Sequence, residues 1–169
     1  MHLLKSNLLA MALLCLVITS CSKEDSIETE VAKYEIDLSL AHKNDGEMSN
    51  RILELVNIHR ASLGLNELQM DSQYASAFAV DHTQYMIEKE QINHDNFGFR
   101  SEGIKYYDGA QVVGENVAYG YDTAEKAVSA WLKSPGHQSI IEGNFTHTGF
   151  GIVKCAKGRN YFTQMFYRK

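Results

Sequence analysis

The chain has 169 residues, a formal net charge of −5 and 44% hydrophobic residues. This length allows one compact domain with a buried core and leaves no room for a second domain of ordinary size. A mildly acidic chain without a basic run also excludes nucleic acid as an expected partner.

The N-terminus has the pattern of a secretory signal. Residues 1–7 carry a single cation, Lys5, and residues 8–18 form an unbroken apolar run that small residues close. This run is too short to span a bilayer comfortably. We therefore expect residues 1–20 to be a signal peptide.

The end of this signal, Ile18-Thr19-Ser20-Cys21, resembles a bacterial lipobox, in which the cysteine thiol is acylated and becomes the first residue. Two or three acyl chains make a stable anchor, because each buried methylene contributes about 0.8 kcal/mol. The alternatives are an uncleaved signal anchor and a plain signal with an unmodified cysteine. The pattern predicts lipidation of Cys21, which makes the membrane a partner and places the protein in the bacterial envelope, periplasmic or surface-exposed.

Residues 21–46 are expected to form a lipidated tether, because they are rich in Glu, Asp, Ser and Lys. Within it, Ser22-Lys23-Glu24-Asp25 resembles the acidic tether that some Gram-negative lipoproteins use for export to the outer surface, and a solvated linker explains it equally well. Cys15 leaves with the signal and Cys21 is lipidated, so Cys155 has no partner and no disulfide is expected.

The first half of the folded domain, expected at residues 47–169, has two helical patterns. Apolar residues recur at helical spacing from Ser49, and Gly64 stands where a C-cap is expected. A second helix begins after Asp71, a good N-cap, and continues through Met86. Residues 91–109 are expected to form a long irregular connection, and such loops are often functional.

The next segment is predicted to contain a strand and a third helix. Val112 to Tyr119 indicate a strand around a turn at Gly114-Glu115-Asn116. Asp122 and Glu125 form a capping-box pattern for a helix over residues 124–133.

The C-terminal segment contains a short fourth helix and two alternating patterns, at residues 148–154 and 161–167. The polar residues between them predict a hairpin turn. Helices come first and an antiparallel strand pair last, so the expected fold class is α+β.

Five histidines fall in the expected domain. His59 and His82 lie on apolar helical stripes, where a histidine is more often a packed, hydrogen-bonded core residue than a ligand. His147 precedes a strand and could lie at the surface. His94 lies in the long connection beside Asp95, which would orient its ring or cap a turn.

His137 follows the only proline of the chain in Ser134-Pro135-Gly136-His137. Ser134 is expected to be an N-cap and Pro135 to occupy the first helical position. The positive end of the helix dipole would then lower the pKa of His137. A neutral imidazole near pH 7 can accept a proton or bind a metal.

Glu115 lies in an otherwise apolar strand region. Its carboxylate must be paired or face a cavity, because burying it alone is expensive. Pairing with His94 or His137 would satisfy it, and a bulge that lets it reach solvent is the alternative. These residues could converge only through the fold, since the chain has no HExxH pattern of zinc peptidases. Cys155 shows no local sign of activation as a nucleophile.

Residues from about 49 to 167 resemble the CAP superfamily, also called SCP-like or cysteine-rich secretory, antigen 5 and pathogenesis-related 1 domains, in its short bacterial form. The resemblance rests on motifs in one order: LVNIHRASLGLNEL, YASAFAVDHTQYM, INHDNF, GENVAYGYDTAEKAVSAWLKSPGHQSII, NFTHTGFGI and YFTQMF. It implies an α-β-α sandwich, with a small antiparallel sheet between helical layers and an open cleft on one side.

In better-described members of this family the cleft holds two His and two Glu, and in some it binds a divalent metal. His94 matches the first histidine, Glu115 the glutamate of the GEN motif, and His137 the second histidine. The resemblance therefore implies that these three residues line the cleft and are the metal-ligand candidates.

The second family glutamate has no counterpart in this sequence. In many eukaryotic members it follows the helix tryptophan by three residues, and the matching position after Trp131 is Ser134. Glu125 is the nearest acidic candidate on the same helix, although its expected capping role already explains it. Three protein ligands with an open position can still hold zinc, so zinc or another divalent metal is the cofactor to test.

The resemblance does not supply one activity, since family members have been associated with lipid or sterol binding, protein interaction and, in scattered cases, proteolysis. The first hypothesis is an envelope-anchored module that binds a lipid, peptide or protein ligand at the His/Glu cleft. The second is a zinc-dependent hydrolase of peptide or envelope polymer. In it His94 and His137 hold the metal, and Glu115 and His137 are the catalytic candidates.

Overall fold

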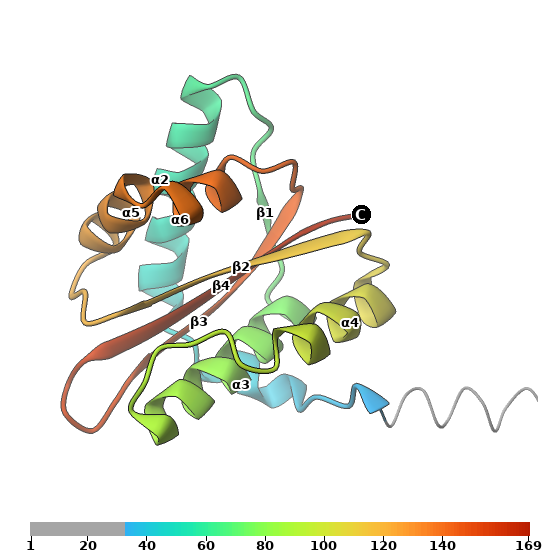
Figure 1. Cartoon of the computed structure of the whole chain (residues 1–169), viewed down its shortest axis with the longest axis vertical. Helices are drawn as coiled ribbons and strands as arrows, with labels where there is room; N and C mark the ends of the chain where they lie inside the picture. The colour runs from blue at the N-terminus through green and yellow to red at the C-terminus, as the bar shows by residue number, and fades with distance from the viewer. Residues whose placement is uncertain (1–32) are drawn as a thin grey trace, which may run out of the picture.

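The computed structural model describes residues 33–169, which form an α+β sandwich as expected: a sheet lies between two helical layers (Figure 1). The predicted signal peptide, the predicted lipidation of Cys21 and residues 21–32 of the predicted tether lie outside the described residues. Within residues 33–169 we find no helix with both the length and the apolar character needed to cross a bilayer.

The sheet has four strands in the order β1-β3-β4-β2. Their bounds are β1 Gln69–Met70, β2 Val112–Tyr119, β3 His147–Lys154 and β4 Asn160–Arg168. β4 pairs antiparallel with both β2 and β3, which confirms the predicted hairpin, and its residues are buried almost throughout. The short strand β1, which the sequence did not indicate, pairs parallel with β3, so the sheet is mixed rather than purely antiparallel.

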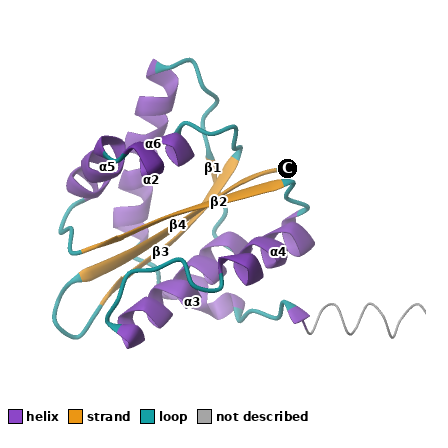
Figure 2. Cartoon of the chain, viewed as in Figure 1, coloured by secondary structure: helices purple, strands orange, loops and turns teal. Residues whose placement is uncertain are grey.

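Helices cover both faces of this sheet (Figure 2). One layer contains α2 (Gly46–Ser62), α5 (Ala124–Lys133) and α6 (Pro135–Ile141). The other layer contains α3 (Tyr74–Lys89), α4 (Phe97–Asp108) and the 3-10 helix η1 (Leu38–Lys43). Each layer buries its own hydrophobic core against the sheet.

The domain begins earlier in the chain than residue 47. Asp45 caps α2 by accepting a hydrogen bond from the Met48 amide at 3.0 Å. The segment before it is fixed to β3, because the Ile152 amide donates to Asn44 Oδ1 at 2.9 Å and the Asp45 amide donates to the Ile152 carbonyl at 3.0 Å. The η1 helix also packs on α3. The last part of the expected tether is therefore part of the folded domain.

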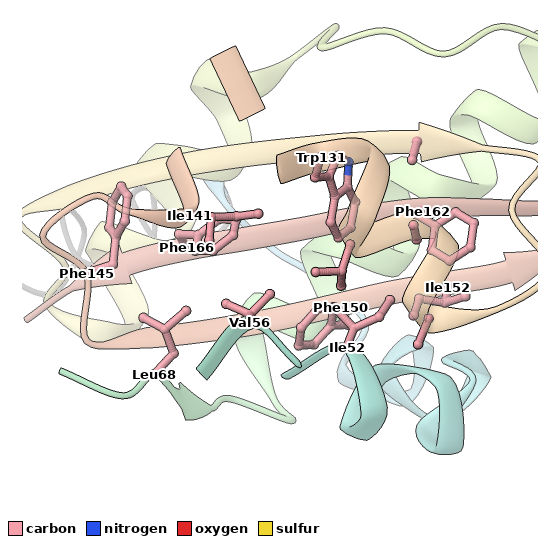
Figure 3. Packing of buried hydrophobic residues seen from close by; sticks show 14 residues of the cluster. Ile52, Val56, Leu68, Trp131, Ile141, Phe145, Phe150, Ile152, Phe162 and Phe166 are labelled. Carbon is pink, nitrogen blue, oxygen red and sulfur yellow. The ribbon is translucent and has the colours of Figure 1, made fainter. Parts of the chain in front are cut away.

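The larger core lies between the sheet and the α2, α5 and α6 layer (Figure 3). Trp131 is its largest side chain, is 2% exposed and donates from Nε1 to the Val117 carbonyl at 3.1 Å. Phe150, Phe162 and Phe166 of β3 and β4 complete the centre. Full burial of one such side chain contributes about 1.5–3 kcal/mol, so this core fixes α5 and, with it, the start of α6.

The opposite layer approaches the sheet unusually closely. A Cβ atom at Gly149 would lie 2.5 Å from the backbone of Ala75 and Ser76, and one at Gly151 would lie 2.3 Å from the backbone of Ala79. Because real Cβ atoms essentially never come that close, α3 can rest on β3 only where these side chains are missing. This contact fixes the position of α3.

The expectation of an irregular connection over residues 91–109 is wrong for its second part, which is helix α4. The helix starts after Asn96 and ends at Gly109, both with positive φ. Ile104 is the only large apolar side chain among its buried residues, the others being Arg100, Ser101 and Gly103, so the sequence lacks an apolar stripe to reveal the helix. Gly103, which suggested a loop, is needed in the helix because a Cβ there would lie 2.3 Å from the Phe78 ring.

Two further local predictions are wrong. The GEN segment makes no turn, since β2 is one continuous strand paired with β4, and the Phe145 ring occupies the space of a side chain at Gly114. The N-cap of α5 is Thr123, whose Oγ1 accepts from the Lys126 amide at 3.2 Å. Asp122 and Glu125 therefore form no capping box.

Candidate functional site

Two of the three residues matched to the family motifs meet directly in the structure. Glu115 comes from the middle of β2, and His94 comes from the loop between α3 and α4. His94 Nδ1 and Glu115 Oε1 are 2.7 Å apart. The Glu115 side chain is 2% exposed and that of His94 is 53% exposed, so a buried carboxylate holds the inner edge of an exposed imidazole.

Arg100, on α4, neutralises this buried carboxylate. Its Nε donates to Glu115 Oε2 at 2.8 Å and its Nη2 donates to Glu115 Oε1 at 2.9 Å. Nη1 donates to the carbonyl of Asp95 at 2.6 Å. Burial lowers the pKa of Arg100 and the charge of Glu115 opposes that shift. The two-point geometry is the strong form of an ion pair, and it also fixes the loop that carries His94.

Sequence reasoning did not identify Arg100. A buried arginine needs partners, so its place on the inner face of a helix would have been a signal. This inference could not be made from the sequence, because residues 91–109 were expected to form a loop. In a loop, no residue can be assigned to a buried face from its spacing.

The Glu115 contact defines the tautomer of the neutral His94 ring. A carboxylate paired with guanidinium has no proton to donate, so Nδ1 of His94 carries the hydrogen in this contact. In the neutral ring Nε2 is then the free acceptor. The site therefore offers a hydrogen-bond acceptor whose orientation is fixed by a buried ion pair.

His137 lies in the first turn of α6, close enough to His94 for the two to interact electrostatically. Its own pKa is lowered, first by burial and then by the charge of His94. The direction agrees with the sequence-based expectation, whereas the main cause is burial. Ser134 is the N-cap residue and Pro135 follows it, but the Ser134 side chain makes no capping hydrogen bond.

Asn116 holds α6 against β2. It is fully buried, and its Nδ2 donates to the carbonyl of His137 at 3.1 Å. Its Oδ1 is buried without a hydrogen-bond partner, as is Oε1 of Gln164, the residue opposite it on β4. Glu115 and Asn116 are adjacent in β2 and therefore face opposite sides of the sheet. Glu115 positions His94 on one side, and Asn116 positions the backbone of His137 on the other.

The remaining candidates make no hydrogen bond or ion pair with the side chains of His94, Glu115 or His137. Glu125 is exposed on α5 and forms an ion pair with Arg51 of α2 at 2.8 Å. His59 pairs with Glu142 at 2.9 Å. His82, 2% exposed, bonds through Nε2 to the carbonyl of Asn93 at 2.8 Å, directly before His94. His82 is thus a buried, hydrogen-bonded residue of the core, whereas His59 is hydrogen-bonded but only partly buried.

The donor set was compared with the metal centre that the family resemblance implies. Among residues 33–169, no three His, Cys, Asp or Glu side chains gather so as to hold a metal ion. Both oxygens of Glu115 are already engaged by Arg100 and His94. Only the His94 and His137 imidazoles remain, so these residues do not fit a centre that needs three protein ligands.

Several known proteins are similar to this chain. The family model described as "Cysteine-rich secretory protein family" (CAP) matches residues 53–166. YkwD of Bacillus subtilis (strain 168) is 35% identical over 127 residues, which are 70% of this chain and 46% of YkwD. The match therefore spans less than half of that relative.

Two solved structures extend the comparison. An outer surface protein from Borrelia burgdorferi gives a TM-score of 0.66 at 23% identity, over 75% of this chain and 96% of that one. An extracellular SCP-domain protein from Bacillus anthracis gives 0.60 at 29% identity, over 75% of this chain and 41% of that one. The first likeness concerns the fold alone. With a family model matched over most of its length, the chain belongs to the cysteine-rich secretory protein (CAP) family.

Proposed function

We propose that this protein is a ligand-binding module of the bacterial envelope, held at the membrane by a lipid on Cys21. Its site is formed by His94, which the Glu115–Arg100 ion pair holds, and by His137, which is close enough to interact with His94 electrostatically. The ligand class that this site favours is a peptide or a segment of another protein.

The observation that carries the proposal is the complete engagement of Glu115. Its two oxygens accept from Arg100 and His94 within 2.7–2.9 Å. A general base or a metal ligand needs a free lone pair directed at the substrate or the ion. A carboxylate neutralised in this way instead fixes its neighbours, which favours recognition over hydrolysis.

The ligand class follows from the two imidazoles. In its neutral form the His94 ring offers Nε2 as an acceptor, and the lowered pKa of His137 favours the neutral form of that second ring. Two neutral acceptors suit the N–H and O–H donors of a peptide. A lipid chain offers none, which is why a lipid is the less favoured ligand for this site.

The proposed location rests on separate observations. The lipobox-like sequence ending at Cys21 supports an anchor. The secretory description of the family and the extracellular relative from Bacillus anthracis support export from the cytoplasm. Membrane release of a Cys21→Ser variant, with loss of the acyl mass, tests this part alone.

A paired assay tests binding against hydrolysis. Protein labelled with 15N in its histidines is titrated with peptides from a protease digest of the envelope. Signals of His94 and His137 should shift while that of His59, paired with Glu142 in another part of the fold, stays in place. Hydrolysis of casein or purified envelope polymer that requires zinc chloride and disappears in His137→Ala would overturn the proposal.

A further inference from the structure

An aromatic patch lies where the chain enters the domain. We define it by five rings that follow one another at short range, those of Tyr34, Tyr74, Phe99, Tyr106 and Tyr107. Tyr34 lies 6.0 Å from Phe99 and 6.1 Å from Tyr106, Tyr106 lies 5.0 Å from Tyr107, and Tyr107 stacks on Tyr74 at 4.2 Å. Phe99 and Tyr106 remain 39% and 38% exposed.

This exposure is built into α4 and is not the result of a loose helix end. Phe99 and Tyr106 are seven residues apart and so share one helical face. The rotation of the helix is fixed by Arg100, whose ion pair with Glu115 is buried. Phe99 also packs edge-on against the fully buried Phe78 at 5.9 Å. Phe99 and Tyr106 are therefore held on a fixed face of α4, where both rings remain partly exposed.

We infer that the aromatic patch contacts the membrane, with the rings of Tyr34, Phe99 and Tyr106 resting in the interfacial layer of the bilayer. Tyrosine and other aromatic rings favour this layer because one part of the ring is apolar and another can reach water. A contiguous exposed patch of this kind indicates an interaction surface, whereas single exposed apolar residues do not.

The position of the aromatic patch in the chain supports the membrane as its binding partner. This step rests on the proposed anchor at Cys21. Eleven residues lie between Cys21 and Lys33, the first described residue, and the chain from one to the other spans at most about 40 Å. Tyr34, the next residue, is part of the patch. A tether this short holds the patch near the bilayer at an effective concentration of about millimolar order, so a weak contact is populated.

Charge around the patch favours a neutral lipid surface over a charged polymer. Lys33 and Lys105 flank its residues in the sequence, and so do Glu35, Asp37 and Glu102. This mixture gives no excess of positive charge to attract an anionic surface. The contact should therefore depend on apolar burial and persist when salt is raised.

The test uses tryptophan as a depth probe. Phe99→Trp places the probe in the patch, and Tyr119→Trp is the matched control, since Tyr119 is an aromatic residue of β2 that is 44% exposed. The only native tryptophan, Trp131, is buried in both variants. On phosphatidylcholine vesicles with brominated acyl chains, the Phe99→Trp emission should shift to shorter wavelength and be quenched, at low and high salt alike. The Tyr119→Trp emission should be unchanged.

Two forms of the protein test the membrane contact of the patch separately from the lipid anchor at Cys21. One is the full chain purified from membranes, and the other starts at Ser22, keeps the whole described domain and is held on nickel-chelating lipid by a histidine tag. If mass spectrometry finds Cys21 unmodified in the full chain and the tagged form is still quenched, the proposed lipid anchor is wrong and the membrane contact of the patch is supported. An acylated chain without quenching would overturn the patch. A concentration-dependent blue shift without vesicles would assign it to a second copy of the chain and overturn the inference as well.

Discussion

Arg100 Nε and Glu115 Oε2 lie 2.8 Å apart in a place where the two side chains are 3% and 2% exposed. The pair joins α4 to the strand β2 and holds the His94 ring through the second carboxylate oxygen. Its integrity therefore affects both the stability of the domain and the geometry of the candidate site.

Replacing one member of this pair should destabilise the domain strongly. Arg100→Ala leaves Glu115 as an uncompensated buried charge, and breaking such pairs costs about 3–5 kcal/mol. Urea unfolding of the full chain measures the loss. Arg51→Ala, which removes an exposed ion pair with Glu125, is the control and should leave the free energy of unfolding nearly unchanged.

Replacing both members should cost much less. In Arg100→Met/Glu115→Leu, packed apolar side chains take the place of the pair, and such exchanges are often neutral. A double variant as unstable as Arg100→Ala would show that the residues are not coupled in this way.

The neutral His94 ring should carry its proton on Nδ1. The 15N shifts of the two ring nitrogens distinguish the tautomers, and the contact with Glu115 stabilises this one. Glu115→Gln weakens the preference because its amide can also donate. Finding Nε2–H as the main form in the unmodified protein would contradict the proposed acceptor role of His94.

Asp108 should make the domain less stable as pH rises through its folded-state value. Burial and the charge of Asp71 raise the pKa of Asp108 to about 6 from 3.8, and its Oδ2 is buried without a partner. Between these values the folded state holds the proton that the unfolded state releases, so stability falls with rising pH. Asp108→Asn should therefore stabilise the chain at pH 7.5 and change it little at pH 4, by urea unfolding at both pH values. The opposite order would contradict the sign of this shift.

Zinc should bind no more than weakly. Two imidazoles are the only donors that the site leaves open, because Glu115 is engaged on both oxygens. Calorimetric titration of metal-free protein with zinc chloride measures the affinity, with His137→Ala as the matched variant. Tight stoichiometric binding that His137→Ala abolishes would show that Glu115 or another ligand rearranges to complete a metal centre.

Gly151→Ala should destabilise the domain although it adds one methyl group. That group would lie 2.3 Å from the backbone of Ala79, and overpacking of this kind costs about 1–3 kcal/mol. Gly46→Ala is the control, since no atom lies within 4 Å of the position a Cβ would take there. Equal thermal midpoints for both variants would show that α3 moves away from β3 freely.

Much of the fold could be predicted from the sequence, because periodic burial leaves a readable pattern. The apolar spacing along α2 and α3 and the alternation in β3 and β4 both come from side chains that face a core. α4 could not be predicted in this way. Its inner face consists of Arg100, Ser101, Gly103 and Ile104. Only Ile104 joins a hydrophobic cluster, so this face has a single large apolar side chain and no apolar stripe.

The candidate site shows the same division. His94, Glu115 and His137 could be proposed from motifs that resemble the family. Because a buried carboxylate must be paired, His94 and His137 could both be proposed as partners of Glu115, and the structure has His94 in that position. The stronger partner, Arg100, lies fifteen residues away on a helix that the pattern did not reveal. A pairing that depends on tertiary structure produces no pattern in the local sequence. The ion pair of Glu115 with Arg100 could therefore be identified only from the fold.

The two glycines of β3 have an effect well beyond the strand itself. With α3 resting on bare backbone at Gly149 and Gly151, the thickness of this half of the sandwich is set by main-chain atoms, which cannot be compressed. His82 on α3 in turn holds the carbonyl of Asn93, next to His94. The distance of His94 from the sheet is thus set by backbone contacts of the fold. A change of ligand preference would have to come from exchanging exposed side chains around His94.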